Sequence, residues 1–197
     1  MPEANFNKSL NLPSKGGVYV RLKDKGDKVK FLIAGTPHYE TIHWVGDKQF
    51  ELCGKYNSDE PTKATCQYCE DYARAIEEKD KETEKAIRPV TNFYYPILDL
   101  VTNKPSIFQF SAKSIHYTIK NYADEGLDVF DTVWVVERTN EQGPNYYKVL
   151  NMGKPKLTPE NKEQLVLAKE LKIKTGKSSD SVTDEVPMPD EPAVEGS

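Results

Sequence analysis

Residues 17–35 read GVYVRLKDKGDKVKFLIAG, and both halves of this stretch alternate between apolar and polar side chains. The apolar positions are Val18, Val20, Leu22, Val29, Phe31 and Ile33. The polar or amphipathic positions are Tyr19, Arg21, Lys23, Lys28 and Lys30. A period of two residues predicts β-strands with one buried face, and the intervening Lys-Gly-Asp predicts that the two strands pair as a hairpin. The opposite face of this hairpin is basic and aromatic.

Similar patterns recur along the chain and are interrupted by helical ones. Further strands are expected at YETIHWV (39–45), QFELC (49–53), NFYYPILDLV (92–101), PSIFQF (105–110), VFDTVWVVERT (129–139) and NYYKVLNM (145–152). Helices are expected over 66–88, over 111–126 with Ser111 as N-cap, and from Thr158-Pro159 through Leu171. Strands without a βαβ rhythm predict a mainly β, α+β fold. A five-stranded Greek-key barrel with a helix-bearing insertion fits best, although other β-rich α+β folds share the pattern.

Composition divides the 197 residues into a folded body and two polar ends. We expect a flexible arm over 1–16, a core over 17–152 with an insertion at about 43–88, a helical segment over 153–174, and a disordered tail over 175–197. Residues 177–197 hold one lysine against six acidic residues, a net charge of −5. The other 176 residues hold 26 basic and 25 acidic residues, so the acidity of the chain belongs to its tail.

The sequence has no run of about 18 apolar residues and no signal-peptide pattern at its start. We therefore expect a cytoplasmic protein without a membrane segment. In a reducing compartment, clustered cysteines more often bind metal than form disulfides.

All three cysteines lie within a short stretch that also contains two histidines. Cys66 and Cys69 form a CxxC pair at a loop-to-helix junction, Cys53 lies across a loop before them, and His43 lies on the preceding strand. Together these residues predict a closed site of three thiolates and one imidazole. Such a site selects Zn²⁺, and a full protein shell predicts one structural zinc ion. His38 competes for the fourth position, but it follows Pro37 in a predicted turn. A redox CxxC pair and three unrelated core thiols are the alternatives.

A basic and aromatic face is the second candidate site. If the strands close as a barrel, one groove would be lined by Tyr19, Arg21, Lys23, Lys28, Lys30, Tyr94 or Tyr95, Tyr146 and Lys148. Basic side chains follow a phosphate backbone and aromatic rings stack on unpaired bases, so this face predicts nucleic-acid binding. Solvated lysines and core tyrosines on ordinary strands would give the same pattern.

No motif for catalysis is present, and we expect the protein not to be an enzyme. The strand-end residues Asp99 and Asp131 leave a metal-dependent nuclease as a rival hypothesis.

The order His43, Cys53, Cys66 and Cys69 in a β-rich body with an acidic tail resembles the zinc-containing, helix-destabilising single-stranded DNA-binding proteins of tailed bacteriophages. The resemblance extends over about residues 17–152 and includes KVKFLIAG, FYYPILDL, SIFQFSAKSI and NYYKVL. It implies an OB-fold whose groove binds single-stranded DNA without sequence preference, beside a zinc-stabilised subdomain, and it implies no enzyme activity.

That resemblance implies a role in DNA replication, recombination or repair, in the host cytoplasm if the chain is phage-encoded. The acidic tail would block the groove or recruit replication or recombination proteins. The first residues contain only Lys8-Ser9 of the family's basic arm motif, so we expect a monomer or weak self-association on DNA. The alternative is a zinc-stabilised protein-interaction module that does not bind DNA.

Overall fold

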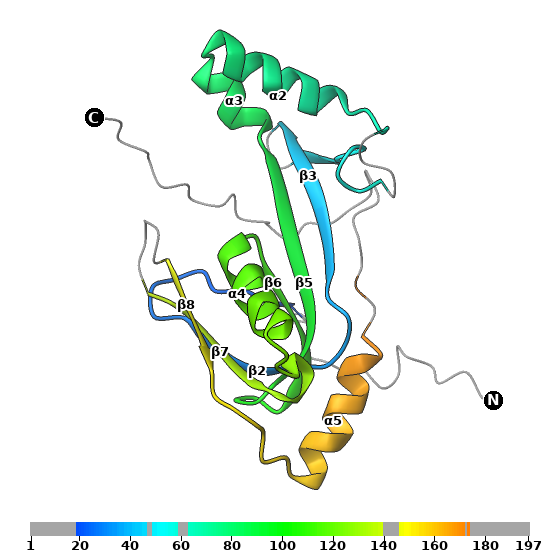
Figure 1. Cartoon of the computed structure of the whole chain (residues 1–197), viewed down its shortest axis with the longest axis vertical. Coiled ribbons are helices and arrows are strands. Elements are labelled where there is room, and N and C mark those ends of the chain that lie inside the picture. Colours follow the sequence, from blue (N-terminus) through cyan, green and yellow to red (C-terminus); the bar gives the residue numbers. More distant parts are fainter. Residues whose placement is uncertain (1–18, 47–48, 59–62, 140–145, 172, 174–197) are drawn as a thin grey trace, which may run out of the picture.

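The computed structural model describes residues 19–46, 49–58, 63–139, 146–171 and 173 (Figure 1). These residues form a mixed α+β structure dominated by one sheet of eight strands. The strands are β1 (Tyr19–Val20), β2 (Lys28–Ile33), β3 (His38–Gly46), β4 (Gln49–Leu52), β5 (Pro89–Asp99), β6 (Lys104–Phe110), β7 (Val133–Arg138) and β8 (Tyr147–Asn151). The α-helices are α2 (Gln67–Glu78), α3 (Lys81–Ile87), α4 (Lys113–Asp124) and α5 (Pro159–Lys169), and a 3-10 turn spans Val129–Asp131.

The main path of the sheet runs β1-β6-β5-β2-β7-β8, while β3 pairs with β5 and β4. The predicted hairpin between the strands of residues 17–35 is wrong, because β1 pairs in parallel with β6 (Tyr19 opposite Ile107). β2 instead pairs with β7 over Lys28–Leu32 and with β5 over Phe31–Ile33, so its two neighbours in the sheet are β7 and β5. The predicted pairing of the last two strands is confirmed, because β7 and β8 are antiparallel neighbours.

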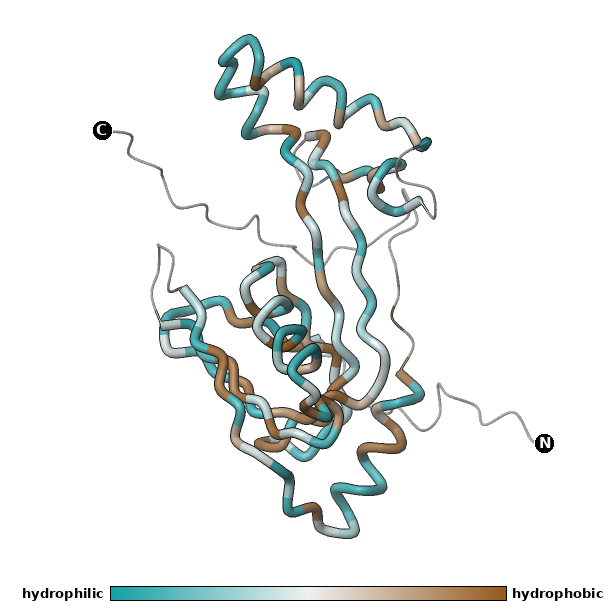
Figure 2. The backbone as a smooth tube through the Cα atoms, in the orientation of Figure 1, coloured by the Kyte–Doolittle hydropathy of each residue, from teal (hydrophilic) through white to brown (hydrophobic). Residues whose placement is uncertain are grey.

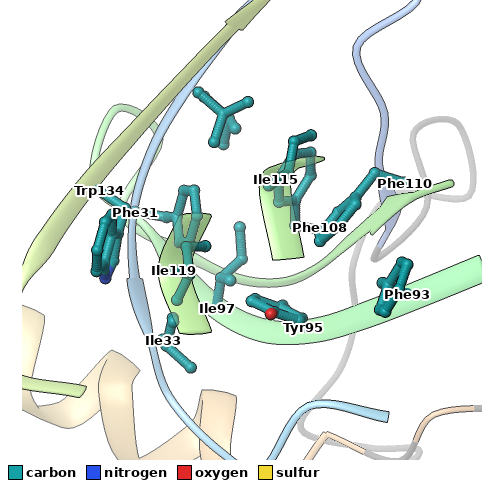
Figure 3. Close-up of a cluster of buried hydrophobic side chains, with 12 residues drawn as sticks. Phe31, Ile33, Phe93, Tyr95, Ile97, Phe108, Phe110, Ile115, Ile119 and Trp134 are labelled. Atoms are coloured by element: carbon teal, nitrogen blue, oxygen red, sulfur yellow. The ribbon is translucent and has the colours of Figure 1, made fainter. Parts of the chain in front are cut away.

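The core lies between the inner face of the sheet and helix α4 (Figure 3). On β2 and β5 every second residue points inward, and Ile115 and Ile119 present one stripe of α4 to them. The cluster comprises Val29, Phe31, Ile33, Phe93, Tyr95, Ile97, Phe108, Phe110, Ile115, Ile119, Trp134 and Val136. Helix α4 begins one residue later than predicted, with Ala112 instead of Ser111 at its N-cap.

Helix α5 covers part of the opposite, outer face of the sheet. Leu32, Leu98 and Val133 form an apolar cluster there, against which Leu157 and Leu165 pack. The predicted start of this helix is confirmed: Thr158 is the N-cap of a capping box completed by Asn161, and Pro159 is the first helical residue. Asn161 also donates a 2.7 Å hydrogen bond to the Asn103 side chain in the turn between β5 and β6.

Strand β5 is long enough to belong to two parts of the molecule. Its second half pairs with β2 and β6 in the body, and its first half pairs with β3 in a two-stranded arm (Figure 1). The arm carries β4, α2 and α3 at its far end. The single helix predicted for 66–88 is two helices, because Lys79 adopts a left-handed φ of 57° and the Asp80 side chain caps the second helix through Thr83 N–H.

Other predictions fall partly or wholly outside the described residues. The arm over 1–16 and the tail over 175–197 both lie there, as does the loop of residues 140–145 between β7 and β8. Among the helices that the structure describes, none has the length and apolar composition needed to cross a membrane.

Candidate metal centre

Four donor side chains meet at the far end of the arm. His43 comes from β3, Cys53 directly follows β4, Cys66 is the N-cap of α2, and Cys69 lies in the first turn of that helix. Their donor atoms all lie within 4.8 Å of one another. The predicted set of His43, Cys53, Cys66 and Cys69 is therefore one cluster, and it can hold a metal ion.

The spacing of the donors fits four-coordinate binding. His43 Nε2 lies 3.4 Å from Cys69 Sγ and 3.6 Å from Cys66 Sγ, and Cys53 Sγ lies 3.4 Å from Cys69 Sγ. Metal–ligand bonds of about 2.0 to 2.3 Å in a tetrahedron keep neighbouring donors roughly 3.5 Å apart. All three cysteines are free thiols, and a disulfide would need sulfur atoms at about 2.05 Å. The arrangement therefore matches a metal site more closely than a redox pair.

His43 is held in the orientation that a ligand needs. The residue is fully buried, and its Nδ1 makes a 2.7 Å hydrogen bond to the carbonyl oxygen of Ile87, the last residue of α3. Because the carbonyl can only accept, Nδ1 carries the proton and Nε2 presents its lone pair to the thiols. The Tyr68 ring packs against the imidazole, with centroids 5.5 Å apart. Neither Ile87 nor Tyr68 has a sequence pattern that would have indicated this role.

The loop after Cys53 is fastened to the arm by Asn57. Asn57 Nδ2 donates to the Thr41 carbonyl oxygen at 2.6 Å, and Asn57 Oδ1 accepts from Thr41 N–H at 2.8 Å. Cys53 N–H also donates to the Thr41 carbonyl, and Tyr56 N–H points at Cys53 Sγ at 3.4 Å. Asn57 was not among the predicted site residues. Its position, four residues after a cysteine that follows a strand, is the local signal that could have indicated these backbone contacts.

Crowding of the thiols favours a cation between them. Burial raises the pKa of Cys66, but hydrogen bonds from the backbone N–H groups of Cys69 and Gly54, with those of the Cys53 and Cys69 thiols, together leave the pKa below its ordinary value. Burial, together with Cys53 and Cys66, raises the pKa of Cys69 to about 12. Successive deprotonation of neighbouring thiols is therefore costly unless a positive charge compensates it.

The outer helices have almost no core that would hold them in place without the cluster. Helix α2 buries only Ala75, and α3 buries no residue. Figure 2 shows hydrophilic residues over most of this helix pair, whereas hydrophobic residues gather in the strands of the body. The donors are thus the main link between α2 and the arm.

His38 is not part of this centre. It lies at the start of β3, opposite Tyr94, with ring centroids 6.1 Å apart. Across the described ranges, the cluster with His43 is the one group of His, Cys, Asp and Glu side chains that is arranged to hold a metal ion. Asp99 instead accepts hydrogen bonds from Val101 N–H and the Thr102 hydroxyl in the turn after β5.

Comparison with known proteins leaves the centre to be interpreted from its own geometry. No protein-family model matches the chain, and no curated protein matches it. The donor set, its spacing and its supporting hydrogen bonds are therefore the grounds for its chemistry.

The lysines of the predicted nucleic-acid face lie on the outer side of the sheet. Lys28 and Lys30 on β2 and Lys148 on β8 are exposed, as is Lys23 in the preceding loop. The strand register places Glu137 of β7 directly between Lys28 and Lys148. This row of side chains is therefore basic at both ends and acidic at its centre.

The tyrosines expected at the same face have different surroundings. Tyr94 is only 6% exposed, and its hydroxyl donates to the buried carboxylate of Glu40. Burial and this carboxylate raise its pKa. The Tyr19 ring meets that of Tyr94 edge-on at 6.5 Å and packs against the small cluster that Tyr94 forms with Ile107 and Leu171. Beside them Arg21 Nε donates to Gln109 Oε1 at 2.8 Å.

Two further tyrosines lie elsewhere. Tyr95, the alternative to Tyr94 in the predicted groove, instead points into the core, where it is 2% exposed, because neighbouring residues of a strand face opposite sides. Tyr146 is half-buried beneath the Arg138 guanidinium, 4.5 Å from its ring centroid. The α5-covered cluster of Leu32 and Leu98 lies between the lysines of β2 and the Tyr19–Tyr94 pair.

Replacing Gly54 by alanine is expected to weaken metal binding about tenfold or more, as loss of the interactions that support metal ligands usually does. A Cβ at this position would lie 2.9 Å from the Thr65 carbonyl oxygen, so the backbone would have to move and carry its N–H away from Cys66. Competition with a chromophoric chelator measures the affinity. Gly35→Ala is the control, because its Cβ would make only ordinary 3.7 Å contacts with Pro96. Equal affinities in the two variants would contradict the expectation.

Proposed function

We propose that the protein binds single-stranded DNA without sequence preference and coats exposed strands during DNA replication, recombination or repair. The observation that carries this proposal is the assembly of His43, Cys53, Cys66 and Cys69 into one cluster. This donor order is the most specific part of the resemblance to the phage single-stranded DNA-binding proteins. The chain would then act by binding, without catalysing a reaction.

The bound ion in this proposal is one structural Zn²⁺. Three sulfur donors and one imidazole favour zinc over hard cations, and four protein ligands leave no open position for a substrate. When bound, zinc would supply a cross-link between β3, the loop after β4 and the start of α2. The residues that bind DNA would lie on the body and the arm.

The body in this proposal is an OB-fold. Three features support it: β2 is hydrogen-bonded on both edges, β1 runs parallel to β6, and the described strands leave β1 and β8 unpaired with each other. An OB-fold is a five-stranded barrel that is only partly closed.

The phosphates of the strand would meet Lys23, Lys28, Lys30 and Lys148, whose exposure leaves them available. Tyr146 would serve bases that approach these lysines. Tyr19, together with Arg21 at its bond to Gln109, would extend the contact beyond the α5-covered cluster of Leu32 and Leu98. The acidic residues 177–197 would compete for the basic side chains, or recruit replication or recombination proteins. We propose a monomer, or weak self-association on DNA, in the cytoplasm.

Titration of fluorescent oligo-dT at two salt concentrations tests this proposal. The protein should bind at low salt and weaken as salt rises, because each phosphate contact contributes about 0.7 to the slope of log K against log salt for single strands. The double variant Lys28→Ala/Lys30→Ala should lower that slope by roughly 1.4 if both lysines contact phosphates. Lys81→Ala is the matched control, since this exposed lysine pairs with Glu84 on the outer helices.

The following outcomes would contradict the proposal. Absence of binding at low salt, or binding that ignores salt, would refute it directly. Deletion of 177–197 should tighten binding; if neither the intact nor the shortened chain binds DNA, a protein-interaction module is the better interpretation. Degradation of the oligonucleotide with Mg²⁺ present would favour the nuclease that Asp99 and Asp131 suggest.

A further inference from the structure

A chain of aromatic rings crosses the side of the arm that faces helix α4. Tyr39 of β3 lies beside Phe93 of β5 with ring centroids 6.4 Å apart, and Phe93 stacks on His116 of α4 at 4.5 Å with only 18° between the planes. His116 then meets Tyr117 edge-on at 5.6 Å. The rings come from three elements that are distant in sequence, so no single local pattern produces the row.

The two ends of the row are open to solvent, while its middle is held in place. Tyr39 is 59% exposed and Tyr117 is 54% exposed, whereas Phe93 is 6% exposed. The His116 ring is fixed by a 2.8 Å hydrogen bond between its Nδ1 and the Tyr95 hydroxyl. Burial, with a smaller effect of the Lys120 charge, lowers the pKa of His116, which favours the uncharged ring that stacks on Phe93.

Positive charge flanks the row on helix α4. Lys113 precedes His116 and Tyr117 by one helical turn, and Lys120 follows them by one turn, so all four side chains share one face of the helix. Both lysines are exposed. Lys120 forms an ion pair with Asp124, whereas no ion pair joins Lys113 to an acidic residue within the described ranges.

This combination has a definite chemical complement. Exposed rings offer stacking surface to planar bases, and cations one turn away on either side suit the phosphates that link those bases. An apolar peptide would use the rings but not the flanking lysines. An acidic peptide would use the lysines but would leave two tyrosines exposed.

We infer that Tyr39 and Tyr117, joined through Phe93 and His116, form a base-stacking platform for single-stranded nucleic acid, with Lys113 and Lys120 beside it for the phosphates. The inference rests on the proposed function. It adds base contacts on the α4 side of the arm, separate from the lysines of β2 and β8 and from Tyr19 and Tyr146. Thr41 and Thr91 are the next pair on this side of the arm, between the Tyr39–Phe93 pair and His43. A strand bound to the platform would therefore lie between the body and the metal centre.

The experiment compares two probes of equal length, oligo-dT and an abasic oligomer that has only the sugar–phosphate backbone. Tyr39→Leu and Tyr117→Leu should each lower the affinity for oligo-dT about 5- to 150-fold, which is the usual range for loss of one stacked base. Affinity for the abasic oligomer, and the salt slope for both probes, should stay unchanged. Tyr117→Phe should retain binding, because it keeps the ring.

Tyr56→Leu is the matched control, because this tyrosine is 50% exposed but lies on the loop after Cys53, away from the row. Circular dichroism and the melting temperature confirm that the variants are folded. If the unaltered protein binds oligo-dT in a salt-dependent way but the platform variants bind like Tyr56→Leu, the platform alone is refuted. Equal losses on both probes would also refute stacking. If the unaltered protein binds neither probe, the proposed function fails and the platform fails with it.

Discussion

Replacing Cys66 by serine is expected to release the metal and to unfold the outer part of the arm while the body stays folded. Zinc contributes roughly 10 kcal/mol or more of apparent folding free energy in zinc-finger peptides, and α2 and α3 have almost no buried side chains that would offset such a loss. The body contains its own core between the sheet and α4, which includes none of the four donors. Loss of the metal is therefore a local event.

Native mass spectrometry measures the metal, and amide hydrogen exchange locates the unfolding. We expect one zinc per unaltered chain and none in Cys66→Ser, with protection lost in α2 and α3 and retained in β2 and β7. His38→Ala is the control and should keep the ion, because His38 lies outside the cluster. Retention of the ion by Cys66→Ser, or its loss from His38→Ala, would show that the ligand set is wrong.

Replacing Trp134 by alanine is expected to destabilise the body by about 3–5 kcal/mol, the usual cost of truncating a large buried aromatic side chain. Trp134 is fully buried, its Nε1 donates to the Val129 carbonyl at 3.0 Å, and its ring meets Tyr122 of α4 edge-on at 5.5 Å. The change opens a cavity between β7 and α4 and leaves the Val129 carbonyl without its partner.

Urea unfolding followed by circular dichroism measures this change. The control is Phe130→Ala, which removes a ring that is 49% exposed in the turn just before β7, and it should shift the free energy of unfolding by about 0.5 kcal/mol or less. The zinc content of both variants should match that of the unaltered chain. A comparable loss of stability in the two variants would contradict the assignment of Trp134 to the core.

The four-residue donor cluster could be predicted from sequence because most of its information is local. Two cysteines at the start of a helix point the same way whatever the rest of the fold does, and the loop before them is long enough to return Cys53 to the pair. The choice of His43 over His38 rested on the extended pattern around Ile42 and Trp44 and on a predicted turn at His38. The structure instead places His38 at the start of the same strand, β3, outside the cluster. The supporting hydrogen bonds of Asn57 and Ile87 depend on tertiary contacts, so they were not predictable.

Two of the errors share a physical cause, because each concerns a choice made by a distant partner, whereas the third is local. Strand β1 has two residues, too few to determine its own pairing, and its partner Ile107 lies far along the chain. Tyr94 and Tyr95 are adjacent, and a tyrosine can lie on a buried or on an exposed face of a strand. The register of β5 with β6 is what places Tyr95 in the core. The break between α2 and α3 at Lys79 lies among residues that are all compatible with a helix except Asp80. Asp80 ends the first helix because its side chain caps the second one through Thr83 N–H.

The aromatic row was missed because it also depends on distant partners, although part of it has a local signal. Lys113, His116, Tyr117 and Lys120 have the spacing of one helical face, which the sequence displays. Tyr39 and Phe93 join them only because β3 pairs with β5 and α4 packs beside it. Aromatic rings between two lysines on one helix face are therefore a sequence pattern that indicates a binding surface, but the pattern gives only half of the row.

Strand β5 limits how freely this fold can be recombined. The first half of β5 forms one side of the arm, and its second half forms the centre of the body. Exchanging residues 43–88 for a metal-binding segment of another length or twist would therefore alter where Phe93 enters the core. A successful graft would have to preserve the ladder from His43–Pro89 to His38–Tyr94. Homologous chains should accordingly vary in the loops and helices beyond the cluster more readily than in the spacing along β5.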